Sequence, residues 1–178
     1  MSKVFIDPGH GGKDPGAVVP LPGTSAQVLE KNLNLLISLD MRRLNLGHDL
    51  LLSRDTDTWV SLKRRVSMAN SWPANAFVAI HCNASDAEEP HGVEVLYYPG
   101  SKRGKKLAKE IEEAVKITMG SSRGLKERPD LYVLHRTRMP AVLVECGFMT
   151  NPQDLAILTS EYQALALAIL SGISKALV

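Results

Sequence analysis

Three polar side chains follow apolar, strand-like runs in this sequence of 178 residues. His10 follows the run KVFID, His81 closes FVAIH, and Glu145 closes AVLVE. Bringing an imidazole or a carboxylate out of a hydrophobic run is costly unless the group is paired or bound to a metal. In open α/β sheets, ligands bind beyond the carboxyl ends of parallel strands. We therefore expect these three side chains to meet at one edge of a sheet.

Glu30 is a fourth candidate, because it begins a helical pattern beside the apolar stripe that contains Leu33 and Ile37. Acidic residues also favour the first turn of a helix simply because they complement its dipole. Two imidazoles and one carboxylate, however, are the ligands of a catalytic zinc that keeps a fourth position open for water. The sequence therefore suggests a zinc site formed by His10, Glu30 and His81. No HExxH pair occurs, so the support comes from where these residues lie relative to the expected strands and helix rather than from a short motif.

The glycine-rich stretch VFIDPGHGGKDPGA contains His10 and has a competing interpretation as a phosphate-binding loop. That interpretation requires GxGxxG, or GxxxxGK followed by Ser or Thr, opening directly into a helix. Neither pattern is present, and a long proline-containing loop follows until near Glu30. The glycines are better explained by a backbone that crowds around His10 without side-chain clashes.

Strand-like and helix-like patterns alternate along the chain, and several apolar strands have no polar face. This order favours a single α/β domain over residues 1–178, with helices on both faces of its sheet. The expected strands are Lys3–Asp7, His48–Ser53, Phe77–Ile80, Gly92–Tyr98, Leu131–Leu134 and Ala141–Glu145. The expected helices are Glu30–Leu46, Leu62–Ser71, Lys102–Met119, one starting at Pro152 behind an Asn151 cap, and one begun by a capping box of Ser160 and Gln163.

The composition is that of an ordinary globular domain, with 44% hydrophobic and 22% charged residues. A net charge of +2 is too small to indicate a nucleic-acid partner. Cys82 and Cys146 form no CxxC pair, so we expect buried free thiols. No apolar segment approaches membrane-spanning length, and the strand-like run in the N-terminal MSKVFIDPGH is too short for the apolar region of a signal peptide, so we expect no export signal in this chain.

Other polar residues have weaker functional interpretations. Asp7 and Asn83 are candidate substrate contacts or hydrogen-bond partners of ligating histidines, with turn chemistry as an equal alternative. His48 and His91 fit surface or structural positions. His135 fits such a position too, but the strand expected before it would end near the proposed site.

Six blocks of the sequence occur in an order that resembles a known family. They are IDPGHGGKDPGA, the helix begun by Glu30, SRDTDTWVSLKRRVSMAN, FVAIHCNAS, GVEVLYY and MPAVLVECGFMTNPQD. Together they resemble, over nearly the whole chain, the zinc-dependent N-acetylmuramoyl-L-alanine amidases of the type-3 family, found in bacterial wall-remodelling enzymes and phage endolysins. The resemblance implies one twisted, mostly parallel sheet of about six strands. It places the zinc ligands at His10, Glu30 and His81 and the catalytic glutamate at Glu145.

The chain departs from the family pattern at a few positions: Ala79, where serine is frequent, Cys82, where alanine is frequent, and His135, where arginine is common. These departures concern substrate contacts rather than the metal ligands. The implied substrate is peptidoglycan, cut at the amide between N-acetylmuramic acid and L-alanine. Three alternatives stay open: a zinc peptidase acting within the stem peptide, a noncatalytic wall-binding module, and a metal-free anion-binding domain. We expect a monomer acting at the cell wall, extracellular or periplasmic, as a phage-type endolysin or an excised catalytic domain.

Overall fold

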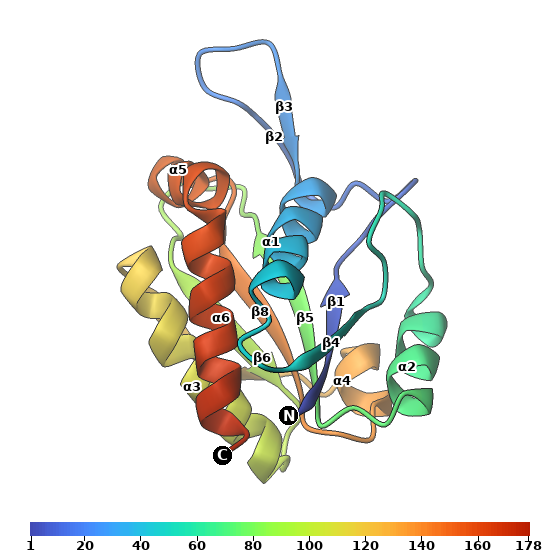
Figure 1. Cartoon of the computed structure of the whole chain (residues 1–178). Coiled ribbons are helices and arrows are strands. Elements are labelled where there is room, and N and C mark those ends of the chain that lie inside the picture. The colour runs from blue at the N-terminus through green and yellow to red at the C-terminus, as the bar shows by residue number, and fades with distance from the viewer.

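A computed structural model describes residues 1–178, and a six-stranded sheet forms its centre (Figure 1). The strand order is β4-β1-β5-β8-β6-β7, and every neighbouring pair is parallel except β6 and β8. This confirms the predicted α/β class and the mostly parallel sheet. The strands of the sheet are β1 (Lys3–Pro8), β4 (Asp49–Leu52), β5 (Ala76–Asn83), β6 (Val93–Tyr97), β7 (Ser122–Glu127) and β8 (Ala141–Phe148).

Helices cover both faces of the sheet, as predicted (Figure 1). They are α1 (Glu30–Leu44), α2 (Leu62–Ser71), α3 (Lys102–Met119), α4 (Tyr132–Arg136), α5 (Pro152–Ser160) and α6 (Tyr162–Ala176). On one face, side chains such as Ile6, Val78 and Val144 join α1, α3 and α6 in the larger core. On the other face, Phe5 and Phe77 stack with ring centres 5.7 Å apart in a smaller core with α2 and α4.

Strands β5 and β8 alternate between these two cores because successive side chains point to opposite faces of a strand. His81 and Glu145 extend the rows that face α2 and α4, where only a short helix and one of ten residues provide cover. The strands also continue past both residues, so that His81 and Glu145 lie within β5 and β8 rather than at their ends. A register shift after His81 accompanies this continuation. His81 and Glu145 therefore lie beyond the smaller core and are only partly buried.

A second, two-stranded sheet was not predicted. Strands β2 (Val18–Pro20) and β3 (Gln27–Leu29) pair as an antiparallel hairpin within the long loop between His10 and Glu30. Figure 1 shows this hairpin projecting from the end of the molecule where α1 begins, while both termini lie at the opposite end. His10 and Glu30, on either side of the hairpin, therefore lie at the end of the sheet away from the termini.

The prediction of a strand over Leu131–Leu134 is wrong. This apolar stretch forms the one-turn helix α4, in which Val133 and Leu134 are buried against the smaller core. Helix and strand cannot be separated by apolar content alone in a run of four residues. The sixth strand is instead β7, whose sequence SRGLKE is polar because β7 lies at the edge of the sheet.

Two helix boundaries also differ from the prediction. Helix α1 ends at Leu44 rather than at Leu46, because Asn45 takes the left-handed conformation. The expected capping box at α6 does not form, since Ser160 donates its hydroxyl to the carbonyl of Ala156 within α5. Asn151, in contrast, caps α5 as predicted, accepting from the backbone N–H groups of Gln153 and Asp154.

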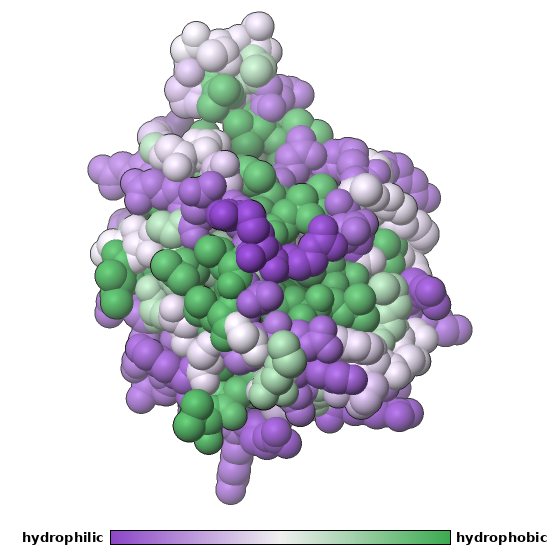
Figure 2. Space-filling view, viewed as in Figure 1, coloured by the Kyte–Doolittle hydropathy of each residue, from purple (hydrophilic) through white to green (hydrophobic).

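Cys82 and Cys146 are buried free thiols, as predicted. No single helix has both the length and the apolar character needed to cross a membrane, although α5 and α6 together, bent by 84°, would meet these two criteria. Figure 2 shows polar and apolar residues interspersed over one face of the molecule.

Candidate metal centre

His10, Glu30 and His81 converge from three separate elements, as the sequence suggested. The Glu30 carboxylate lies between the two imidazoles, with Oε2 3.0 Å from Nε2 of His10 and Oε1 2.9 Å from Nδ1 of His81. One ligand atom from each residue lies within 4.8 Å of the other two. Two nitrogens and one oxygen at this spacing could hold a metal ion.

The glycine-rich loop brings His10 to the cluster through an unusual backbone. His10 has a φ of 60°, in the left-handed region that non-glycine residues seldom adopt. The neighbouring glycines leave room for the ligands: a Cβ on Gly9 would collide with the His81 ring, and one on Gly16 would collide with Glu30 Oε2 and lie 2.7 Å from Cδ2 of His10. The loop is therefore glycine-rich because the side chains of His81, Glu30 and His10 occupy the space beside its backbone.

Glu30 reaches the cluster because α1 begins with it. The helix has no side-chain N-cap, and its first N–H groups, from Glu30 and Lys31, instead donate to the carbonyls of Ala17 and Pro15. The Glu30 carboxylate also accepts from the backbone N–H groups of Ala17 and Cys82. Five per cent exposure and these bonds fix the carboxylate in one place, which a mere helix-dipole residue would not require.

Asp14 is a functional candidate that the sequence analysis missed. Its Oδ2 lies 2.9 Å from Nδ1 of His10, on the side of the ring away from Glu30. A carboxylate at this position fixes the tautomer of a metal-ligating histidine and leaves the other nitrogen free for the metal. The signal was present in the sequence, since Asp14 follows His10 by four residues in a tight glycine-rich loop.

Electrostatics within the cluster follow from this packing. Burial lowers the pKa of His10, but hydrogen bonds and charge from Glu30 and Asp14 outweigh burial and raise that pKa to about 9. Burial raises the pKa of Glu30, but the hydrogen bonds from His10 and His81 outweigh it and hold this pKa well below its usual range. In the absence of a metal, these interactions therefore favour a protonated His10 at neutral pH.

Glu145 lies beside the cluster without joining it. Its backbone pairs with that of His81 across β5 and β8, and with that of Glu94 across β8 and β6. Burial raises the pKa of Glu145 to about 7, with Glu30 and Glu94 adding to the rise and His81 opposing it. Its Oε2 is buried and has no hydrogen-bond partner. An unpaired buried carboxylate of this kind is costly to a fold and typical of a site that exchanges protons.

Asp7 lies beneath the His10 loop rather than in the cluster. Its carboxylate accepts from Ser53 at 2.5 Å and from the buried Arg65 at 2.6 Å. Arg65 also donates to the carbonyls of Pro8 and His10, both at 2.7 Å. Arg54 donates to the carbonyls of Pro8 and Gly9 from the other side. Asp7 thus pairs with Arg65, which in turn donates to the His10 carbonyl, and the sequence analysis identified neither arginine.

The two remaining candidates, Asn83 and His135, differ in their position relative to the cluster. Asn83, at the end of β5, lines a cavity that also contains Glu30 and Glu145, although its side-chain oxygen accepts from the adjacent Ala84 N–H. His135 lies at the end of α4, where it stacks on Tyr98 with ring centres 5.1 Å apart. It lines a different cavity, with Lys102 and Arg138, and does not come together with the cluster, because the strand expected before it is a helix.

Comparison with known proteins places this arrangement in a family. The sequence profile of the family described as N-acetylmuramoyl-L-alanine amidase matches residues 4–175. The N-acetylmuramoyl-L-alanine amidase CwlM of Bacillus licheniformis is 38% identical over 99% of this chain and 69% of its own. LytC of Bacillus subtilis, also named an N-acetylmuramoyl-L-alanine amidase, is 40% identical over 85% of this chain but only 30% of its own.

Solved structures agree in fold. The catalytic domain of CwlV, an N-acetylmuramoyl-L-alanine amidase from Bacillus (Paenibacillus) polymyxa var. colistinus, superposes with a TM-score of 0.88 at 34% identity, covering 98% of this chain and 97% of that one. The sheet and the histidine–glutamate cluster define an α/β domain with a candidate metal centre. The chain belongs to the N-acetylmuramoyl-L-alanine amidase family.

Proposed function

We propose that this protein is a zinc-dependent N-acetylmuramoyl-L-alanine amidase, which hydrolyses the amide between the lactyl group of N-acetylmuramic acid and the L-alanine of the stem peptide. The observation that carries the proposal is the buried, unpaired Oε2 of the half-buried Glu145 beside the His10–Glu30–His81 cluster, in a chain whose family match extends over residues 4–175. The relatives named as amidases support the reaction, and the cluster supports the metal.

The three residues of the cluster fit a catalytic zinc. Histidine nitrogen and carboxylate oxygen are ordinary zinc ligands, and three protein ligands leave a fourth position for water or substrate. Zinc bound there would polarise the scissile carbonyl and lower the pKa of a water molecule. His10 would bind through Nε2, since its Nδ1 faces Asp14, and Glu30 would exchange its two histidine contacts for the metal.

Glu145 is the proposed general base and acid. It would accept a proton from the attacking water and return it to the leaving amine, a role for which a pKa near neutrality is suited. Its lack of any hydrogen-bond partner leaves the carboxylate free for both transfers. Asp14 would hold the His10 ring in place, and Arg65 and Arg54 would hold the loop that carries it.

Mass spectrometry of a peptidoglycan digest tests this proposal. An amidase releases intact stem peptides that begin with L-alanine, whereas a peptidase acting within the stem releases shorter fragments. Loss of turbidity of a wall suspension, abolished by a chelator and restored by zinc, tests the metal requirement. Binding to the wall without clearing would contradict catalysis and favour a binding module, and clearing unaffected by the chelator would contradict the zinc site.

A further inference from the structure

Two cavities adjoin the metal cluster and share four residues: His10, His81, Leu131 and Leu143. The first, of about 280 Å³, extends toward the start of α2 and is here called the tryptophan cavity, after Trp59. The second, of about 390 Å³, extends toward β6 and is here called the glutamate cavity, because Glu145 lines it. A substrate that spans the cluster would place one side of its scissile bond in each cavity.

The position of Glu145 indicates which part of the substrate occupies which cavity. This assignment rests on the proposed function. Glu145 lines the glutamate cavity and does not line the tryptophan cavity. A group that protonates the leaving amine must come within hydrogen-bond distance of it. The leaving amine belongs to L-alanine, so the stem peptide must extend into the glutamate cavity. The lactyl group and its sugar then extend into the tryptophan cavity.

The surface of the tryptophan cavity suits a sugar ring. Three large apolar side chains line it while remaining well exposed: Trp59 at 49%, Leu62 at 56% and Tyr132 at 39%. Exposed apolar side chains gathered around one cavity mark a binding surface. The C–H faces of a pyranose and the methyl of an N-acetyl group can pack on such side chains, while the hydroxyl groups remain in water.

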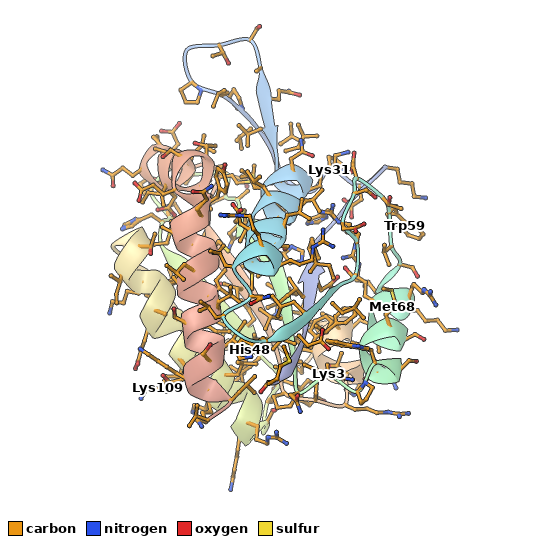
Figure 3. The ribbon with its side chains drawn as sticks, in the orientation of Figure 1. Lys3, Lys31, His48, Trp59, Met68 and Lys109 are labelled. Carbon is orange, nitrogen blue, oxygen red and sulfur yellow. The ribbon has the colours of Figure 1, made fainter.

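Trp59 is held in a defined position relative to the metal ligands. It lies in the loop between β4 and α2, on the same side of the molecule as Lys31 (Figure 3). Asp57, two residues earlier, accepts from Gly12 N–H and from Lys31 Nζ. A Cβ on Gly12 would lie 2.7 Å from the Trp59 backbone nitrogen. Lys13 Nζ lies 4.9 Å from the centre of the Trp59 ring. The loop that carries Trp59 is therefore attached to the loop that carries His10.

We infer that the substrate lies across the cluster with its N-acetylated sugar in the tryptophan cavity and its stem peptide in the glutamate cavity, and that Trp59 is a sugar-binding specificity residue. Trp59 contributes binding energy that a substrate without the sugar ring cannot use. Removing it therefore reduces activity only toward substrates that carry the ring.

Two soluble substrates test this inference: N-acetylmuramoyl-L-Ala-D-Glu peptide, and the same peptide carrying only a D-lactyl group. For Trp59→Ala we expect kcat/KM to fall about tenfold with the sugar substrate, equivalent to about 1.4 kcal/mol. With the lactyl substrate it should stay within about twofold of wild type. Trp59→Phe should retain most of the activity. Leu167→Ala, which removes an exposed apolar side chain on α6 outside both cavities, is the matched control.

Zinc content and thermal unfolding of each variant establish that the site and fold are intact. Equal losses on both substrates, or no loss on either, would overturn the inference while leaving the amidase proposal in place. A loss that grows as the stem peptide is lengthened would show that Trp59 binds the peptide, which reverses the assignment. Failure of the zinc-loaded wild type to cut either substrate at the lactyl amide would instead refute the amidase proposal, and the inference with it.

Discussion

Glu145 of β8 pairs in register with His81 of β5, so that a proposed proton carrier and a proposed metal ligand project side by side from neighbouring parallel strands. This arrangement predicts that metal binding and proton transfer depend on different residues. Glu145→Gln should retain stoichiometric zinc, because Glu145 contacts none of the three ligands through a hydrogen bond. Its turnover should fall at least about a hundredfold, as expected for loss of general acid–base catalysis.

Metal analysis and steady-state kinetics on the same preparation check this prediction. Glu113→Gln, which makes the same chemical change on the exposed surface of α3, is the control and should behave as wild type. Turnover near the wild-type value in Glu145→Gln would remove Glu145 from the mechanism.

Glu30→Ala should lose zinc or bind it weakly while the fold survives. The variant removes one of three ligands, and it also removes the acceptor for the Ala17 and Cys82 backbone N–H groups, so some loss of stability is expected. Metal analysis after dialysis measures the first effect, and circular dichroism of metal-free wild type and variant separates it from the second. Full zinc occupancy in a folded variant would return Glu30 to the role of a helix-dipole residue.

Zinc binding should release a proton from His10. Burial lowers the pKa of this imidazole, but Glu30 and Asp14 raise it to about 9 in the metal-free protein, so a metal must displace a proton at neutral pH. Zinc affinity should therefore strengthen about tenfold per pH unit as pH rises from about 6.5 toward 9. Competition with a chromophoric chelator at several pH values measures the slope, and a flat profile would contradict the protonated cluster.

The raised pKa of His10 also predicts that the stability of the metal-free protein falls as pH rises, whereas its zinc affinity increases. A pKa raised by folding contributes stability that is fully present below the ordinary histidine value of about 6.5 and is lost as pH rises through about 9. Denaturant unfolding of chelator-treated protein across this range checks the sign. Asp14→Asn should weaken the trend, since Asp14 is one of the two groups that raise the pKa of His10.

Gly16→Ala should weaken zinc binding more than Gly23→Ala, although both glycines have a positive φ, of 66° and 76°. The two variants share the cost of placing alanine in the left-handed region, about 1 kcal/mol. At Gly16 the new methyl group would collide with Glu30 and His10. At Gly23 a methyl group would have no atom within 4 Å. Zinc dissociation constants for the pair measure the difference. Equal affinities would show that the loop can move away from its ligands.

Arg65→Met should destabilise the fold by about 3–5 kcal/mol, because it leaves the buried Asp7 carboxylate without its charged partner. The double variant Asp7→Asn/Arg65→Met should recover part of that loss in denaturant unfolding. Arg65→Lys keeps the charge but cannot donate to the Pro8 and His10 carbonyls together, so zinc affinity should fall about 10–100-fold. Unchanged zinc affinity in a folded Arg65→Lys variant would limit Arg65 to a structural role.

Much of the fold was predictable because its strands and long helices carry strong patterns. Apolar runs rich in β-branched residues, such as FVAI and AVLV, favoured buried strands, and the helix from Lys102 to Met119 was predicted with both ends correct. Short or mixed segments were not predictable. Val133 and Leu134 are buried by α2 packing against α4, a tertiary contact, and the polar edge strand β7 gains its conformation from pairing with β6.

In the candidate site, the residues whose own side chains would bind the metal or transfer protons were predictable from the sequence. His10, Glu30, His81 and Glu145 stood out by type and placement, and the structure brings all four together. Arg54 and Arg65 did not stand out, because their roles depend on hydrogen bonds to backbone carbonyls, which a sequence does not show. Arg65 illustrates this: its donors reach Pro8 and His10, more than fifty positions away.

The β2–β3 hairpin joins two proposed zinc ligands, and its base packs against the larger core through Val19 and Val28. Below it, Glu30 N–H donates to Ala17 and Lys31 N–H donates to Pro15, so the chain is fastened before the hairpin departs and after it returns. At the tip, in contrast, a Cβ added to Gly23 would meet nothing within 4 Å. The tip, residues 21–26, can therefore be extended or exchanged for a foreign peptide while Val19 and the proposed ligands stay in place, which makes it a natural position at which to graft a new recognition element onto this domain.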